Sequence, residues 1–146
     1  MRRTGAARFD KSRRVRRRAD FLEIQSRGRR VATPRFVIAL RARGEEPVGR
    51  ARLGITVSRK TGTAVVRNRA KRLVREAFRL TEQLWAPGID VVVIVKHVPQ
   101  GLTLHDVVAE WQSAARQIER RTREAQADQS FRLAAAGGPD KVPKTP

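Results

Sequence analysis

Hydrophobic residues are spaced differently in successive parts of the chain, and each spacing predicts one element. From Val66 to Trp85 they recur at the period of an α-helix with one buried face. The positions on that face are Ala70, Leu73, Val74, Ala77 and Phe78. Pro87 and Gly88 then end the helix. The next segment, Ile89–Lys96, is apolar at nearly every position, which predicts a strand covered on both faces.

Three segments before this helix have weaker patterns. Ala19–Arg27 predicts a short helix, and Gly28 is a natural place for it to stop. Arg35–Arg43 and Arg50–Ser58 are strand-like, and Gly44-Glu45-Glu46-Pro47 between them is a turn signal. The two strands therefore predict a hairpin with one solvent-facing side.

The last patterned segment opens at Thr103 and continues as an amphipathic helix to about Glu124. Thr103 and Asp106 resemble a capping box at its start. The order of elements is helix, two strands, helix, strand, helix. This order predicts an α+β fold, an α-β sandwich in which helices pack on a small central sheet.

Both ends of the chain lack such periodicity. Residues 1–14 predict a flexible basic arm, and residues 126–146, which are rich in small and polar residues, predict a disordered tail. A chain of 146 residues supports one domain of ordinary size, which these ends place at 15–125.

Basic residues outnumber acidic ones by 33 to 14, which gives a formal net charge of +19. All of this excess lies before residue 80, because residues 80–146 contain eight of each sign. Charge concentrated in one half of a chain is typical of a surface that faces a polyanion. A nucleic acid, an acidic substrate and an anionic membrane each satisfy it.

Composition limits which cellular compartments and which kinds of catalytic or metal site fit this chain. The chain has no cysteine, which excludes thiolate zinc sites and a cysteine nucleophile and fits a reducing compartment. No apolar run approaches the roughly 18–20 residues needed to cross a bilayer, so we expect a cytoplasmic protein. His97 and His105 stand at no recognised metal-ligand spacing, and no carboxylates form a convincing pair. We expect no catalytic residue and no metal site in the protein.

The predicted helix has a basic face opposite its apolar stripe. At about 100° per residue, Asn68, Arg72, Arg75 and Arg79 fall on one side, with Lys71 beside them. Arginine binds phosphate oxygens through a planar fork, so the face favours phosphate recognition. A basic helix face that is merely solvated is the alternative. The preceding loop, Ser58-Arg59-Lys60-Thr61-Gly62-Thr63, is also basic, but it does not match a Walker P-loop.

These residues also carry a resemblance to a known family. The run from Leu53 to Lys60, then Gly62, then the run from Ala64 to Arg79 with its Arg-Asn-Arg block resembles the signature of the bacterial ribonuclease P protein subunit. Upstream, Phe21 and Gly28 resemble that family's first helix.

The resemblance implies a function and its partners. The family's protein binds a large catalytic RNA, and the ribonucleoprotein is an endoribonuclease that cleaves precursor tRNA to produce the mature 5′ end. Magnesium ions are expected to be bound mainly by the RNA. No membrane and no obligate protein partner is implied. The family fold is an α-β sandwich with a left-handed crossover through the basic helix, whereas about 98% of such crossovers are right-handed.

The resemblance also assigns roles to residues of this sequence. The residues implied to face the catalytic RNA are Arg67, Asn68, Arg69, Lys71, Arg72, Arg75 and Arg79. Those implied to contact the single-stranded 5′ leader of the substrate, in a cleft between the first helix and the sheet, are Phe21, Arg59 and Lys60. Two family aromatics are replaced here, by Gln25 and Ala39, which weakens the expectation of stacking beyond Phe21.

Two other function classes fit the same charge distribution. A structural RNA-binding protein, such as a ribosomal component, would use the basic helix without a role in processing. A protein that binds anionic membranes would expose bulky apolar residues on the basic helix, but here the apolar stripe is needed for the core.

Overall fold

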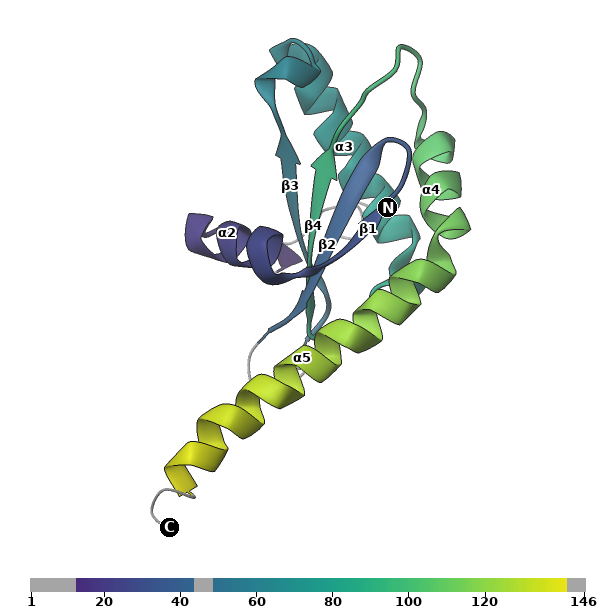
Figure 1. Ribbon diagram of the computed structural model, residues 1–146. Coiled ribbons are helices and arrows are strands. Elements are labelled where there is room, and N and C mark those ends of the chain that lie inside the picture. The colour runs from purple at the N-terminus through teal and green to yellow at the C-terminus, as the bar shows by residue number, and fades with distance from the viewer. Residues whose placement is uncertain (1–12, 44–48, 142–146) are drawn as a thin grey trace, which may run out of the picture.

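The computed structural model describes residues 13–43 and 49–141, with 136–141 described by their backbone alone (Figure 1). At its centre is a four-stranded sheet in the order β1-β2-β4-β3. The strands are β1 (Arg29–Ala32), β2 (Phe36–Ala42), β3 (Arg52–Val57) and β4 (Ile89–Val95). Strand β2 is antiparallel to both β1 and β4, whereas β3 and β4 are parallel. Every residue of β4 except Ile94 is buried, as its continuous apolar run predicts.

The predicted hairpin of Arg35–Arg43 with Arg50–Ser58 is wrong in its pairing. Strands β2 and β3 lie at these positions, but β4 is inserted between them. The reason is that β4 is apolar on both faces, and an interior position in the sheet buries both. The hairpin partner of β2 is β1, which is too short and too polar to have been predicted. The turn signal at 44–47 lies outside the described residues.

Helices cover both faces of the sheet. In the described part of the chain, α2 (Arg18–Arg27) packs on one face, and three helices pack on the other: α3 (Ala64–Leu80), α4 (Leu104–Ser113) and α5 (Ala115–Lys141). The larger core lies under these three helices and includes Phe36, Leu40, Val91, Val93, Val74, Phe78, Trp111 and Ile118. A smaller cluster, formed by Val15, Ile24, Ala39 and Val92, lies under α2. The expected α+β sandwich is therefore confirmed.

Helix α3 connects the two parallel strands. In Figure 1, β3 and β4 point upward, β4 lies to the right of β3, and α3 runs behind them. This arrangement is the left-handed crossover that the family resemblance implies, and general topology rules would have given the opposite hand.

Helix α3 ends earlier than the periodicity predicts, at Leu80 rather than Trp85. The Thr81 hydroxyl donates to the carbonyl oxygen of Ala77 at 2.7 Å and accepts a hydrogen bond from the Trp85 indole at 3.0 Å. These bonds hold the chain in a short 3-10 turn, Glu82–Leu84, in place of a further helical turn. The predicted apolar stripe is correct: Ala70, Val74, Ala77 and Phe78 are buried, and Leu73 is partly buried.

The predicted helix from Thr103 to about Glu124 is two helices. The capping box at its start is confirmed, since the Thr103 hydroxyl accepts from the Asp106 N–H and the Asp106 carboxylate accepts from the Thr103 N–H. At Ala114 the backbone leaves the helical geometry, and α5 begins at the next residue.

The prediction of a disordered tail is wrong for residues 126–141, because α5 continues to Lys141. This extension packs against the sheet. Ala125 and Gln129 are buried, and the Asp128 carboxylate binds the Arg29 guanidinium through two hydrogen bonds of 2.8 Å. The contacts that hold this stretch come from its polar residues Asp128 and Gln129, whereas the small residues described after Ala125, such as Ala127 and Ala134, are exposed.

The predicted basic arm is partly outside the described residues, at 1–12. Its last two residues, Arg13 and Arg14, are fixed. Arg13 is buried, donates to the carbonyl oxygen of Ala51 and lies 5.7 Å from the centre of the Phe78 ring. Arg14 forms a parallel bridge with Leu53.

Replacing Gly28 with alanine should destabilise the fold by about 1–3 kcal/mol. A methyl group there would lie 2.5 Å from the carbonyl oxygen of Ile24 and 2.9 Å from that of Leu40. Urea unfolding would measure this, with Ser26→Ala on the exposed side of the same helix as the control, expected within about 0.5 kcal/mol of wild type. Equal stability of the two variants would contradict the close approach.

The ion pair of Asp128 should make the α5 extension sensitive to acid. Hydrogen bonding to Arg29 lowers the pKa of Asp128 below its ordinary 3.8. The stabilisation is therefore present above that value and is lost as the pH falls further. Urea unfolding should show Asp128→Asn less stable than wild type at pH 6, with the difference shrinking as the pH falls below 3.8. A difference that is constant over this range would contradict the assignment.

Candidate nucleic-acid interface

The predicted basic face of α3 points away from the core. Asn68, Arg69 and Arg72 are exposed, whereas Lys71 and Arg75 are partly buried. Because the opposite side of the helix packs on the sheet, the orientation of this face is fixed by the core. The local sequence also fixes where the helix begins, since the Thr63 hydroxyl accepts the Val66 N–H at 3.3 Å.

Arg67 and Arg69 are anchored to neighbouring loops. The Arg67 Nε donates to the carbonyl oxygen of Gly62 at 3.2 Å, and the Arg69 Nη2 donates to that of Leu102 at 2.7 Å. These bonds tie α3 to the turn before it and to the loop before α4. Both arginines therefore help to position the basic face as well as contributing charge to it.

The charges on the face are not equally available. Arg79 forms an ion pair with Glu76 on the same helix, and this hydrogen bond raises the pKa of Arg79. Arg72, by contrast, has no ion pair within the described part of the chain. The cationic character of α3 is therefore strongest in its first three turns.

A small cavity brings together residues from α2, β3 and α3. Its volume is about 130 Å³, and its lining includes Phe21, Gly54, Lys71 and Arg75. Gly54 is required for this arrangement, because a Cβ there would lie 2.7 Å from the Phe21 ring. The family resemblance assigns Phe21 to the 5′ leader and Lys71 and Arg75 to the catalytic RNA. The structure places all three side chains at the same cavity.

Arg14 also lines this cavity, and sequence reasoning missed it. It is held there because the Val15 N–H donates to the carbonyl oxygen of Leu53 at 2.9 Å, which extends the sheet by one bridge. A single bridge leaves no periodic pattern to find. The pKa of Arg75 is lowered, first by burial and then by the positive charges of Arg14 and Arg72. The cavity wall is therefore a site of concentrated positive charge.

Arg59 and Lys60 lie apart from the cavity. They form the 3-10 turn Arg59–Thr61, which connects β3 to α3, and both are exposed. This turn precedes α3, whose first two turns carry Arg67 and Asn68. The basic surface thus continues from the end of β3 onto the helix.

The two positions that depart from the family pattern have clear structural roles. The Gln25 side-chain amide donates to the Thr56 hydroxyl at 3.2 Å, which ties α2 to β3. Ala39 is fully buried beneath α2. Neither residue offers an aromatic surface, so Phe21 is the aromatic side chain that lines the cavity.

The carboxylates near these basic residues are already engaged. Glu76 binds Arg79, Glu23 binds Arg41, and Asp90 binds Arg52. Among the described residues there is no group of three side chains that could hold a metal ion.

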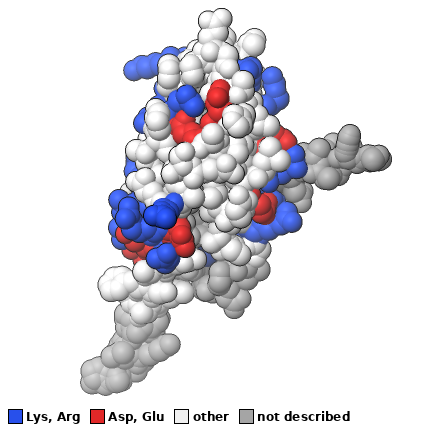
Figure 2. Space-filling model, turned by 90° about the vertical axis from the view of Figure 1, so that its right-hand side faces the viewer, with Lys and Arg blue, Asp and Glu red and all other residues white. Residues whose placement is uncertain are grey.

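Another face of the molecule differs in charge. Figure 2 shows the side on which α4 lies, and most of its surface belongs to uncharged residues, with several of its Lys and Arg groups next to Asp or Glu. Within the described residues, no helix has the length and apolarity required to traverse a lipid bilayer.

The chain is similar to proteins of one family. A sequence model of the family Ribonuclease P matches residues 9–119. The ribonuclease P protein component of Gluconacetobacter diazotrophicus is 41% identical over 102 residues, which is 69% of this chain and 86% of that protein. The RNase P protein of Thermotoga maritima superposes with a TM-score of 0.60 at 32% identity, over 71% of this chain and 96% of that one. For the protein of Staphylococcus aureus the TM-score is 0.59 at 31% identity, over 69% and 90%.

Arg72→Ala should weaken RNA binding in a salt-dependent manner. If Arg72 neutralises a phosphate, its loss should reduce the slope of log affinity against log salt by about 0.7–0.9. Arg116→Ala, which removes an equally exposed charge from α5, is the control and should leave the slope unchanged. Equal slopes for both variants and wild type would show that the α3 face is only solvated.

Proposed function

The chain belongs to the ribonuclease P protein family, and from this premise we propose that it binds the catalytic RNA of ribonuclease P and the 5′ leader of precursor tRNA. The ribonucleoprotein is an endoribonuclease that produces the mature 5′ end of tRNA. An RNA partner follows from the family, and the two specific RNAs are the proposed part.

The observation that carries this proposal is the cavity where α2 meets α3. A nucleic acid strand is held without sequence preference by an aromatic surface for a base and cations for the backbone. The cavity is lined by Phe21 together with Lys71 and Arg75. A strand that passes this point can contact α2 on one side and the basic helix on the other.

The basic face of α3 supports the contact with the catalytic RNA. Arg72 is exposed and has no ion pair in the described residues, and Arg67 and Arg69 fix the helix through backbone carbonyl groups. Fixed arginines lose little conformational entropy on binding phosphate, so their charge is used efficiently. Arg59 and Lys60 extend the same surface toward the end of β3.

The protein contributes electrostatics and positioning. Its carboxylates near the basic surface are paired with arginines, so we assign the magnesium ions of the reaction to the RNA. Those ions would supply the activation of the attacking water. The arginines and lysines lower the repulsion between two RNAs and release their counterions. We also place the protein in the cytoplasm, where bacterial precursor tRNA is made.

Reconstitution tests the proposal. Adding the full chain to a bacterial ribonuclease P RNA should increase cleavage of a precursor tRNA at low magnesium concentration, where the RNA alone is slow because phosphate repulsion is poorly screened. The double variant Arg72→Ala with Arg75→Ala should stimulate less, whereas Arg116→Ala should match wild type. An absence of stimulation by the wild-type chain would refute the proposed function.

A further inference from the structure

Helix α2 divides one face of the sheet into two parts. On one flank, Phe21 packs on Gly54 at the cavity already described, and Gln25 bonds to Thr56. On the other flank, the Glu23 carboxylate points to a different part of the sheet. The proposed leader contacts use the first flank and leave the second unassigned.

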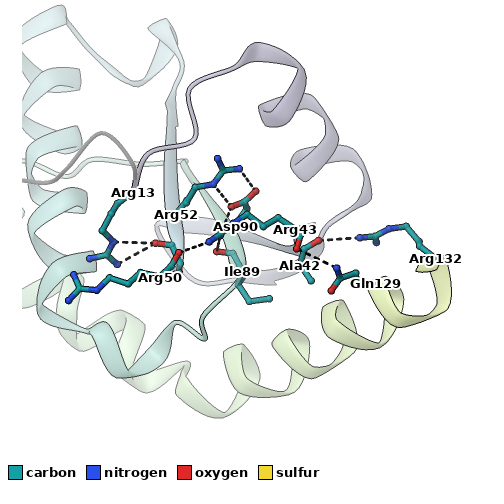
Figure 3. A network of polar contacts seen from close by, with 10 residues as sticks. Arg13, Ala42, Arg43, Arg50, Arg52, Ile89, Asp90, Gln129 and Arg132 are labelled. Atoms are coloured by element: carbon teal, nitrogen blue, oxygen red, sulfur yellow. Dashed lines mark hydrogen bonds and ion pairs between the residues drawn. The ribbon is translucent and has the colours of Figure 1, made fainter. Parts of the chain in front are cut away.

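The second flank contains a separate cavity of about 250 Å³. It is lined by four arginines and three carboxylates: Arg41, Arg43, Arg52, Arg132, Asp20, Glu23 and Asp90. These residues come from α2, from strands β2, β3 and β4 and their ends, and from α5. Figure 3 shows Arg52 and Arg43 converging on Asp90, with Arg132 reaching from α5 to the end of β2.

Most of these charges are paired with each other. The Asp90 carboxylate accepts two hydrogen bonds from Arg52, at 2.8 and 2.7 Å, and one from Arg43 at 3.1 Å. The Glu23 carboxylate accepts one from Arg41 at 2.7 Å. Asp20 adds a further negative charge whose field acts on Arg52.

Arg132 is the surplus cation of this cavity. Its guanidinium donates a hydrogen bond at the wall to the carbonyl oxygen of Ala42, a neutral acceptor, at 3.1 Å. The pKa of Arg41 is lowered, first by burial and next by the charge of Arg132, even though Glu23 opposes this. The lining thus contains four arginines and three carboxylates, and Asp128 lies close enough for its negative charge to act on Arg41 as well.

The position of Arg132 is fixed by the extension of α5. The family match ends at residue 119, whereas α5 continues to Lys141. Asp128 binds Arg29, and the Gln129 amide donates to the carbonyl oxygen of Arg43 at 3.4 Å. The part of the chain beyond the family match thus delivers an arginine to the sheet face.

We propose that this second cavity binds a phosphate group of an RNA backbone, with Arg132 and Arg41 as its ligands. Arg132 exchanges a neutral carbonyl for a charged acceptor, which makes a shorter and stronger hydrogen bond. Arg41 is made available by Glu23, whose side chain is 48% exposed and can turn into solvent, whereas the Arg41 side chain is 14% exposed and stays at the wall. This proposal rests on the proposed function in one respect only, namely the identity of the RNA that supplies the phosphate.

Two RNAs can supply it, the leader of precursor tRNA and the catalytic RNA. Salt titrations with the full-length chain distinguish them. One arm measures the affinity of the chain for the catalytic RNA alone, and the other compares binding of precursor and leaderless tRNA by the assembled ribonucleoprotein. Arg132→Ala should reduce the slope of log affinity against log salt by about 0.7–0.9 in one arm. The affected arm identifies the source.

Three variants control the experiment. Arg120→Ala removes an exposed charge from α5 outside the cavity and should leave both slopes unchanged. Gln129→Ala removes a neighbouring contact of α5 without a change in charge, so it reports on structure alone. Arg132→Lys keeps the charge and should keep most of the slope. Thermal unfolding of each variant confirms that it is folded.

Two results would overturn the proposed site. One is equal slopes for Arg132→Ala and Arg120→Ala in both arms, and the other is a loss with Gln129→Ala as large as that with Arg132→Ala. Failure of the proposed function is separate, because it would appear as an absence of cleavage stimulation by wild type. In that case a single-stranded RNA oligonucleotide replaces both RNAs and still compares Arg132→Ala with Arg120→Ala.

Discussion

Burial of β4 on both faces is the constraint on which the rest of the structure depends. An apolar strand of this kind is stable only where layers cover it from both sides, so it takes an interior position in the sheet. Its parallel neighbour β3 then requires a crossover, and α3 is that crossover. The helix that carries the basic face is thus placed against the sheet by the same contacts that bury β4. The arginines of α3 thereby gain a rigid support.

Asp90 is the exception within β4, and it explains why the charge of the chain forms two groups. A buried carboxylate is costly unless it is fully paired. Arg52 and Arg43 satisfy it, and Arg43 also donates to the carbonyl oxygens of Ile89 and Arg50 (Figure 3). Those arginines join the ends of β2, β3 and β4. The arginines around Asp90 are partly neutralised by it, whereas those of α3 have fewer carboxylate partners. The uncompensated part of the net charge of +19 therefore lies more on α3 than around Asp90.

Sequence patterns predicted where the helices and strands lie better than they predicted which strands pair in the sheet. The stripe of α3, the buried strand β4 and the Thr103 cap follow from local periodicity, and all three are correct. Strand β2 pairs with β4 because the strands compete for the interior positions of the sheet. No local sequence pattern predicts the result of that competition. The extension of α5 was missed because its stability comes from long-range contacts such as Asp128 with Arg29. Arg14 was missed for the same reason.

The divided sheet face follows from the modest packing of α2. Ile24 is its buried residue, and a helix of ten residues with one buried side chain gains little from the hydrophobic effect. Its position therefore depends on polar contacts from both flanks, Gln25 with Thr56 and Glu23 with Arg41. A phosphate bound by Arg41 would replace Glu23, whose carboxylate would turn into solvent, so that one of these two contacts is lost and the other remains. Because Phe21 and Glu23 are on the same helix, α2 forms part of the wall of both cavities, and any effect that a ligand in one cavity has on affinity in the other must be reciprocal.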